Sequence, residues 1–282
     1  MSAPTRVAGP TWDLVADARQ VLQYEFMQNA FAAGTIVAVL AGLVGYFVVL
    51  RRVAFACEAL AHGGFAGATG AAVLGQDVFL GLLVFTSVAG AVMGWLGDRL
   101  RGRDVAIGGT LAFSLALGLL FLSLSSRLSG LAVNILFGSI LSIAGHDVRL
   151  IAIFAAIALV TLAIMFRPLL FASVDAEIAD ARGVPVRGLS VAFMVLLAIT
   201  VSASVQVVGV LLIFALLILP AAAAQQVTAQ PGRAIALAVG MAVLDVWIGL
   251  LVGFYVPFPP SFFITTLAFL TFVGARSAQA VR

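Results

Sequence analysis

Lysine is absent from this sequence, and charged residues of every kind are scarce. All fifteen basic side chains are arginines, and charged residues make up 10% of the 282 residues. A P-loop places a lysine on the nucleotide phosphates, and no GxxxxGK[S/T] stretch is present. No serine, paired-aspartate or HExxH arrangement suits catalysis either. We therefore expect a protein that is not an enzyme, and any ATP that drives it must be hydrolysed by another chain.

Cysteine and histidine are almost as rare. Cys57 is the only cysteine, which excludes a disulfide within the chain, and there are two histidines. The net charge of +3 comes from arginines in the predicted loops, which is ordinary for a membrane protein. This charge therefore indicates no nucleic-acid partner.

Apolar residues, by contrast, make up 63% of the chain, whereas soluble globular domains contain about 45–50%. The apolar runs are continuous and lack the alternating pattern of a membrane β-barrel, so helices are the structure that satisfies their backbone groups in lipid. The sequence predicts an all-α, polytopic helical bundle in the cytoplasmic (inner) membrane.

The apolar runs also divide the chain. Residues 1–25 are mixed in character and predict an interfacial amphipathic segment. Residues 26–276 predict the transmembrane domain, and residues 277–282 a C-terminal tail. With about 20 residues for each span, we expect eight or nine transmembrane helices, near 26–50, 57–75, 78–96, 106–125, 148–166, 188–205, 207–225, 234–256 and 260–275.

Three stretches bear on the number of spans. The first apolar run is too long for the apolar region of a cleaved signal peptide. The run from 189 to 224 is too long for one span, and we expect a break near residues 202–206. Residues 128–143 are apolar but short and interrupted by glycine, which predicts a re-entrant or interfacial helix.

The arginines predict the orientation of the bundle, because cytoplasmic loops carry an excess of basic residues. If Arg51 and Arg52 lie in the cytoplasm, a bundle of nine spans has eleven arginines on the cytoplasmic side. The other four arginines and the N-terminus then lie outside. The cytoplasmic set is Arg51, Arg52, Arg99, Arg101, Arg103, Arg167, Arg182, Arg187, Arg233, Arg276 and Arg282, and the outer set is Arg6, Arg19, Arg127 and Arg149.

Two polar residues stand out inside the second predicted span. Glu58 and His62 are four residues apart, so they lie on one face of a helix about one turn from each other. A carboxylate and an imidazole can hold zinc, manganese or iron(II), with further ligands from elsewhere. A hydrogen-bonded pair that pins neighbouring helices is the equally supported structural interpretation.

Three other residues are weaker candidates. Asp245 lies well inside a span, where it could belong to an ion path or pair with a polar group on another helix. Cys57 is about 100° around the helix from Glu58, so a buried apolar role is favoured over a place in the ion path. His146 lies beside Asp147 at the edge of a span, and a solvated loop is favoured there.

The longest charged segment between spans is 167–188. It predicts a short surface helix from about Asp175 to Arg182, ended by Gly183 and followed by Pro185. The segment is either a solvated loop or a docking helix for a cytoplasmic partner.

The sequence resembles the permease family of zinc, manganese and iron ABC importers. The resemblance extends over nearly the whole chain from residue 26 and rests on five ordered stretches. They are LRRVAFACEALAH at 50–62, NILFGSIL at 134–141, FRPLLFASVDAEIADARGVPV at 166–186, VGVLLIFALLILPAA at 208–222 and FPPSFFITTLAFL at 258–270.

This resemblance implies a homodimer of permeases flanked by two cytoplasmic ATPase subunits, with an extracytoplasmic metal-binding protein that delivers the substrate. It implies that no cofactor is bound permanently, the divalent metal being the transported substrate. By similarity, Glu58 replaces the usual aspartate of a D-x-x-x-H element and His62 matches its histidine. An acidic residue that the family often carries near the last spans is replaced here by the stretch Pro257-Phe258-Pro259.

The resemblance also implies that the segment 175–183 couples transport to the ATPase, and that Pro220 is the proline of the family's LLIxPAA stretch. The coupling residues by this similarity are Asp175, Glu177, Asp180, Arg182 and Gly183. Two alternatives remain open. One is an ABC permease for a metal chelate such as a siderophore or cobalamin, and the other is an ion-coupled secondary transporter that uses Glu58 or Asp245.

Overall fold

The chain folds as a bundle of long helices in a computed structural model that describes residues 21–97, 103–124, 129–138, 140–256 and 258–280. Within these ranges every regular element is helical. The predicted interfacial segment 1–25 lies mostly outside them, as does Pro257. The helices are α2 (Glu25–Leu50), α3 (Ala54–Val73), α4 (Val78–Gly97), α5 (Arg103–Ser123), α6 (Ser129–Phe137), η2 (Ile140–Ser142), α7 (Gly145–Val174), α8 (Ala176–Ala181), α9 (Val186–Val208), α10 (Val210–Val227), α11 (Pro231–Tyr255) and α12 (Pro260–Ala280).

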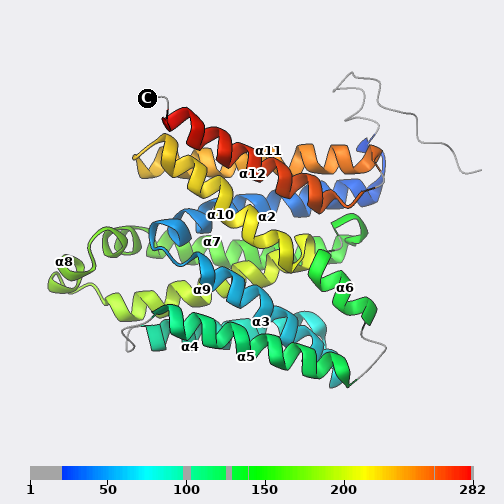
Figure 1. The fold of residues 1–282 in the computed structure, drawn as a ribbon, viewed down its shortest axis with the longest axis horizontal. Helices are drawn as coiled ribbons and strands as arrows, with labels where there is room; N and C mark the ends of the chain where they lie inside the picture. Colours follow the sequence, from blue (N-terminus) through cyan, green and yellow to red (C-terminus); the bar gives the residue numbers. More distant parts are fainter. Residues whose placement is uncertain (1–20, 98–102, 125–128, 139, 257, 281–282) are drawn as a thin grey trace, which may run out of the picture.

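Most of these helices have the length and composition of membrane spans. Seven described helices are long and apolar enough to cross a bilayer. Helices α3 and α12 have 20 and 21 residues and lie side by side with the others in one bundle (Figure 1). The predicted all-α fold of eight or nine spans is therefore confirmed. Helix α12 continues to Ala280, beyond the expected end of the last span.

The ends of the bundle carry the two short helices. Helix α8 projects at one end, between α7 and α9, and α6 lies at the opposite end (Figure 1). The nine-residue α6 is too short to cross a bilayer, as predicted for residues 128–143. Helix α8 coincides with the surface helix predicted from Asp175 to Arg182.

The break in the long run of residues 189–224 falls at Gly209, so the prediction of a break near residues 202–206 was wrong. Hydroxyl groups in that region do not interrupt the helix, because Ser202 and Ser204 donate to the carbonyl groups four residues earlier. Gly209 has φ +85° and ψ 163°, a conformation that essentially only glycine adopts. It ends α9 and starts α10.

Gly209 also brings α6 against this junction. A Cβ atom on Gly209 would lie within 2.5 Å of the backbone carbon of Phe137, and one on Gly138 would lie 2.4 Å from the backbone carbon of Val208. The two glycines therefore permit direct backbone contact between the end of α6 and the α9–α10 break. This contact fixes α6 on the bundle.

Replacing Gly209 by alanine is expected to destabilise the fold by about 1–3 kcal/mol, because the side chain is strained at this φ and collides with α6. The thermal unfolding midpoint of the detergent-purified protein measures the effect. Gly240→Ala is the matched control, since a Cβ there meets open space within a helix. Equal midpoints for the two variants would contradict this description of the junction.

Helix α3 lies at the centre of one half of the bundle, in contact with α4, α5, α9 and α10. Its residues from Gly63 to Ala71 are all buried. Gly67 makes this packing possible, because a Cβ there would lie 2.4 Å from the carbonyl oxygen of Gly81 on α4. Small residues at such crossings let membrane helices approach closely. The polar residues of α3 are consequently held on a rigid, closely surrounded element.

Candidate functional site

The two polar residues predicted to share a face of α3 are in contact. The Nε2 atom of His62 lies 3.1 Å from Oε1 of Glu58, four residues away along the helix. The side chains are 17% exposed for His62 and 30% exposed for Glu58. The pair is thus half-buried in the second and third turns of α3, toward the α8 end of the bundle.

The geometry of this pair suits a cation as well as a shared proton. Two ligand bonds of roughly 2.1 Å at right angles place their donor atoms about 3.0 Å apart, close to the observed 3.1 Å. The other ring nitrogen of His62, Nδ1, is buried and has no hydrogen-bond partner. A cation that displaced the shared proton would therefore find both donor atoms in place with little movement.

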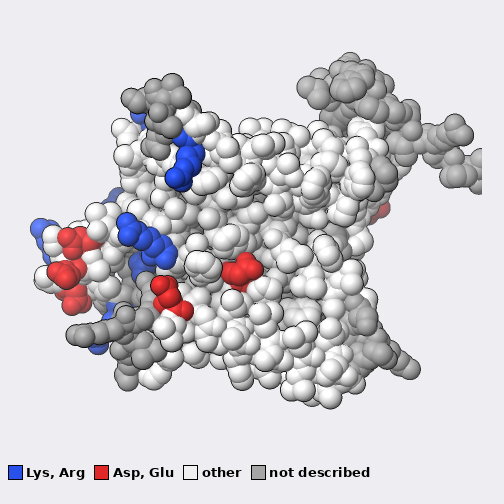
Figure 2. Space-filling view, viewed as in Figure 1, with Lys and Arg blue, Asp and Glu red and all other residues white. Residues whose placement is uncertain are grey.

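The exposed side of the pair is the second relevant feature. In Figure 2 most of the charged side chains visible on this face gather at the α8 end of the molecule. Glu58 is the only acidic residue of α3. A charged side chain at the centre of a bilayer costs about 2.5–3.5 kcal/mol on insertion scales, so such groups face a protein interior or a water-filled path. This side of α3 is therefore unsuited to contact with lipid.

The other candidates for an ion path are not joined to this pair. Cys57 is completely buried in the hydrophobic core, as the apolar interpretation predicted. Asp245 is 2% exposed, and its Oδ2 atom has no hydrogen-bond partner. It lies on α11, which packs against α2, α10 and α12, whereas α3 packs mainly against other helices and shares only α10 and α2 with it. Asp245 therefore belongs to a different part of the bundle.

His146 lies where the sequence indicated, at the exposed start of α7. Its Nε2 atom is 3.2 Å from Oδ1 of Asp147, and its side chain is 69% exposed. Asp147 also accepts a hydrogen bond from the backbone of Ala144 at the start of the helix. No group of three or more His, Cys, Asp or Glu side chains with metal-binding geometry occurs in the described part of the chain.

Helix α8 is a defined surface element rather than an irregular loop. The side chain of Asp175 accepts a hydrogen bond from the backbone N–H of Ile178 and so caps the start of the helix. Gly183, with φ +81°, allows the chain to turn directly after it. Ile178 is 51% exposed, while Ala179 is completely buried. The helix thus presents charged side chains and one large apolar side chain outward.

Arg51 connects the two helices that flank α8, a role that the sequence analysis missed. Its guanidinium group donates hydrogen bonds to Ser173 at the end of α7 and to Ser190 near the start of α9, at 3.3 and 3.4 Å. The same group lies 5.4 Å from the ring centre of Phe193. Because α7 and α9 are the supports of α8, Arg51 joins α2 to the base of that helix.

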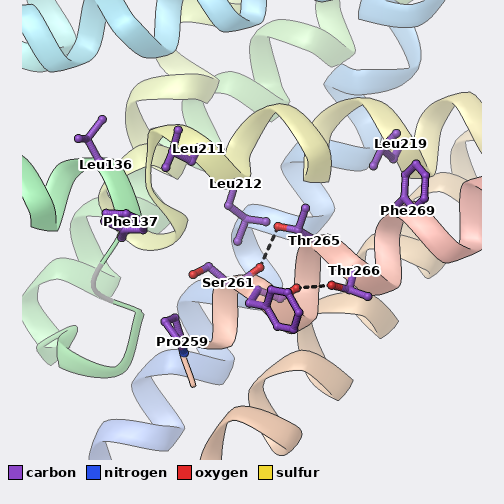
Figure 3. Close-up of a pocket in the computed structure, with 11 residues that line it drawn as sticks. Leu136, Phe137, Leu211, Leu212, Leu219, Pro259, Ser261, Thr265, Thr266 and Phe269 are labelled. Atoms are coloured by element: carbon purple, nitrogen blue, oxygen red, sulfur yellow. Dashed lines mark hydrogen bonds between the residues drawn. The ribbon is translucent and has the colours of Figure 1, made fainter. Parts of the chain in front are cut away.

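A long groove between α10, α12 and the end of α6 has a volume of about 530 Å³. Two of its hydroxyl groups are occupied, since Thr265 and Thr266 donate to the carbonyl groups of Ser261 and Phe262 on their own helix, as Figure 3 shows. The groove therefore offers a mainly apolar surface without a charged ligand for a cation. Its apolar lining includes Leu136, Phe137, Leu212, Leu219, Phe262 and Phe269.

A bundle of membrane-length helices, with a polar pair on a central helix and a charged surface helix at one end, defines a multi-pass membrane protein. The sequence model of the ABC 3 transport family matches residues 23–279. The chain belongs to this family, and the resemblance inferred from five short stretches is confirmed over nearly the whole sequence.

Individual relatives agree with this assignment. The manganese transport system membrane protein MntC of Listeria monocytogenes is 30% identical, over 82% of each chain. The manganese import system permease protein ScaB of Streptococcus parasanguinis is 31% identical, over 82% of this chain and 83% of the relative. Among solved structures, PsaBC from Streptococcus pneumoniae in complex with Fab matches with a TM-score of 0.82 and 29% identity, over 93% and 94% of the two chains.

Proposed function

We propose that this chain is the permease subunit of an importer that moves a divalent transition metal, of the manganese, zinc and iron(II) class, across the cytoplasmic membrane. The observation that carries the proposal is the contact between Glu58 and His62, which places an oxygen and a nitrogen ligand 3.1 Å apart on a central membrane helix. Relatives that share about 30% of the sequence are named as manganese permeases. Manganese is therefore the first cargo to test.

In this proposal the pair acts as a transit point, not as a permanent site. Glu58 supplies a carboxylate oxygen and His62 an imidazole nitrogen, and the partial exposure of both allows water to complete the coordination. Transport requires a site that binds well enough to admit the ion and weakly enough to release it. Two protein ligands from one helix suit such transient binding better than a closed set of four.

The energy for transport would come from separate ATPase subunits that dock on α8. The arginine bias assigns this end of the bundle to the cytoplasm. Ile178 is an exposed apolar side chain among charged neighbours, a combination that suits the centre of a docking surface. A movement of α8 would pass to α7 and α9, which support it, and through Arg51 to α2. An extracytoplasmic metal-binding protein would deliver the ion at the opposite end.

A second copy of the chain would cover the face that carries Glu58. The groove between α10 and α12 is mainly apolar and the hydroxyl groups of Thr265 and Thr266 are satisfied, so a protein partner can bury most of it at little cost in unpaired polar groups. A homodimer formed there would also shield the exposed side of α3 from lipid. The transit path would then run between the two copies.

A cysteine in this groove is expected to cross-link two copies. Cys57 is completely buried, so a new cysteine at Phe262, which is 61% exposed, is the reactive thiol. Treatment of Phe262→Cys in membranes with a short bis-maleimide should give a dimer on a denaturing gel. Ile164→Cys on α7 is the control, because Ile164 is 75% exposed away from the groove. Equal cross-linking of the two variants would contradict the assignment of this face.

The function itself is tested by uptake into proteoliposomes. The permease is reconstituted with and without its co-purified ATPase, and uptake of radioactive manganese is measured with ATP or a non-hydrolysable analogue. ATP-dependent uptake only in the presence of the ATPase supports the proposal. Uptake that follows a proton gradient without any ATPase would indicate a secondary transporter instead. Uptake of a siderophore complex but not of the free ion would indicate a chelate permease.

A further inference from the structure

The end of the bundle opposite to α8 contains a separate, partly polar cavity of about 290 Å³. It lies between the turn that joins α3 to α4, the helix α6 and the last turns of α9. Three of its lining residues carry side-chain oxygen atoms, and each comes from a different element: Asp77, Asn134 and Gln206. The remaining lining residues are apolar and include Val78, Phe79, Leu82 and Ile135.

Two of these three side chains have an oxygen atom that can still accept a hydrogen bond or bind a cation. The Oε1 atom of Gln206 is buried and has no hydrogen-bond partner, and a buried acceptor left unpaired is destabilising. Asp77 uses Oδ1 to accept from the backbone N–H of Leu80 at the start of α4, at 2.8 Å. Its carboxylate is exposed, so its other oxygen remains available. The cavity therefore holds acceptors that a cation or its water molecules would satisfy.

The backbone fixes the positions of two of these groups relative to each other. Asn134 lies on α6 and Gln206 lies near the end of α9, and the contact between Gly138 and Gly209 joins these two elements directly. A preformed cavity loses little free energy in ordering when it binds a ligand. The cavity is therefore preorganised by backbone contacts, unlike a group of neighbouring side chains on a mobile surface.

Size and ligand type indicate the class of ion. Six water molecules occupy roughly 180 Å³ at about 30 Å³ each, so a cation with most of its hydration shell fits the 290 Å³ cavity. Carboxylate, amide carbonyl and water oxygens suit manganese, magnesium and calcium, whereas zinc favours nitrogen and sulfur ligands. The chemistry of the cavity thus differs from that of the Glu58 and His62 pair.

We infer that this cavity is an entry site that receives a hydrated divalent cation of the manganese class before the ion reaches Glu58 and His62. The inference rests on the proposed function, because it gives this cavity the same cargo. Along α3 the distance from His62 to the turn that carries Asp77 is roughly 15–20 Å at 1.5 Å per residue. The two binding sites are thus separate in space. The entry site, whose ligands are oxygen atoms, selects the ion while it is still hydrated.

Manganese binding to the purified full-length permease tests this inference, with the free-ion signal in electron paramagnetic resonance as the readout. Asp77→Asn removes the charge but keeps an oxygen to cap α4, and it is expected to weaken binding at the entry site about tenfold. Gln206→Glu adds a charge to the same cavity and should tighten binding severalfold, a gain that a folding defect cannot produce. Asp147→Asn is the matched control, because Asp147 also caps a helix at this end of the bundle.

The outcomes separate this inference from the proposed function. Unchanged affinity in both Asp77→Asn and Gln206→Glu, or no manganese binding by the wild type, overturns the entry site. The double variant Glu58→Gln, His62→Ala should bind manganese at the entry site with unchanged affinity, because the two sites are independent. Loss of manganese affinity at the entry site in this double variant overturns the inference. A wild-type protein that binds manganese here but transports none would contradict the proposed function alone.

Discussion

Replacement of Glu58 by glutamine together with His62 by alanine is expected to reduce ATP-dependent manganese uptake at least about 100-fold. The double variant removes the negative charge of Glu58 and the imidazole of His62, whose Oε1 and Nε2 atoms lie 3.1 Å apart on α3. Changes around metal sites commonly cost about 10–100-fold each in affinity or activity. The measurement is the initial rate of uptake into proteoliposomes that contain the permease and its ATPase.

The control for this prediction is His146→Ala, which removes the only other histidine of the sequence. His146 is exposed at the start of α7, so its loss should leave uptake within about twofold of the wild type. Co-purification of the ATPase shows whether each variant still assembles. Normal uptake by the assembled double variant would show that Glu58 and His62 only pin neighbouring helices.

Replacement of Arg51 by methionine is expected to uncouple ATP hydrolysis from transport. Methionine keeps much of the apolar stem but cannot donate to Ser173 and Ser190, and it loses the contact with Phe193. Hydrogen bonds to charged groups contribute about 1.5–3 kcal/mol each, so the ends of α7 and α9 would no longer be joined firmly to α2. The ions moved per ATP hydrolysed should fall about tenfold.

Arg52→Gln is the matched control for this variant. Arg52 is the neighbouring arginine, it is exposed, and it forms no ion pair with any residue in the described ranges. Its replacement should leave the ratio of transport to hydrolysis unchanged. If Arg51→Met and Arg52→Gln lower this ratio equally, the effect comes from lost positive charge at the membrane surface and not from the connection to α7 and α9.

Much of the fold could be predicted because its main determinant is local. Continuous apolar runs of about 20 residues define membrane helices without reference to the rest of the chain. The helix α8 was also predictable, because Asp175 and Gly183 are start and stop signals that act within a few residues. The spacing of four residues likewise placed Glu58 and His62 together, because helix geometry alone brings them into contact.

The errors and omissions concern contacts between distant segments. The α9–α10 break was predicted too early, near residues 202–206, where the hydroxyl groups of Ser202 and Ser204 bond to the preceding turn and the helix continues. The break at Gly209 matters for its contact with Gly138, 71 residues earlier, which no local pattern reveals. Arg51 was interpreted only as a topology signal, since its partners Ser173 and Ser190 lie more than 100 residues away.

The entry cavity shows the same limit. Asp77, Asn134 and Gln206 come from three separate parts of the sequence, and only the folded chain brings them around one cavity. Asn134 lay in one of the five stretches that indicated the family, but nothing in that stretch assigned a role to its side chain. The polar side chain of Asn134 within a short, mainly apolar helix was the one signal available.

Coordination of manganese by the imidazole of His62 is the most direct test of the account. Pulsed electron paramagnetic resonance of the manganese-loaded permease detects nitrogen nuclei bound to the ion, and the sequence offers two histidines for comparison. We predict a nitrogen coupling in the wild type and in His146→Ala that disappears in His62→Ala. A coupling that persists in His62→Ala, or its absence from the wild type under saturating manganese, would contradict the proposal that Glu58 and His62 hold the transported ion.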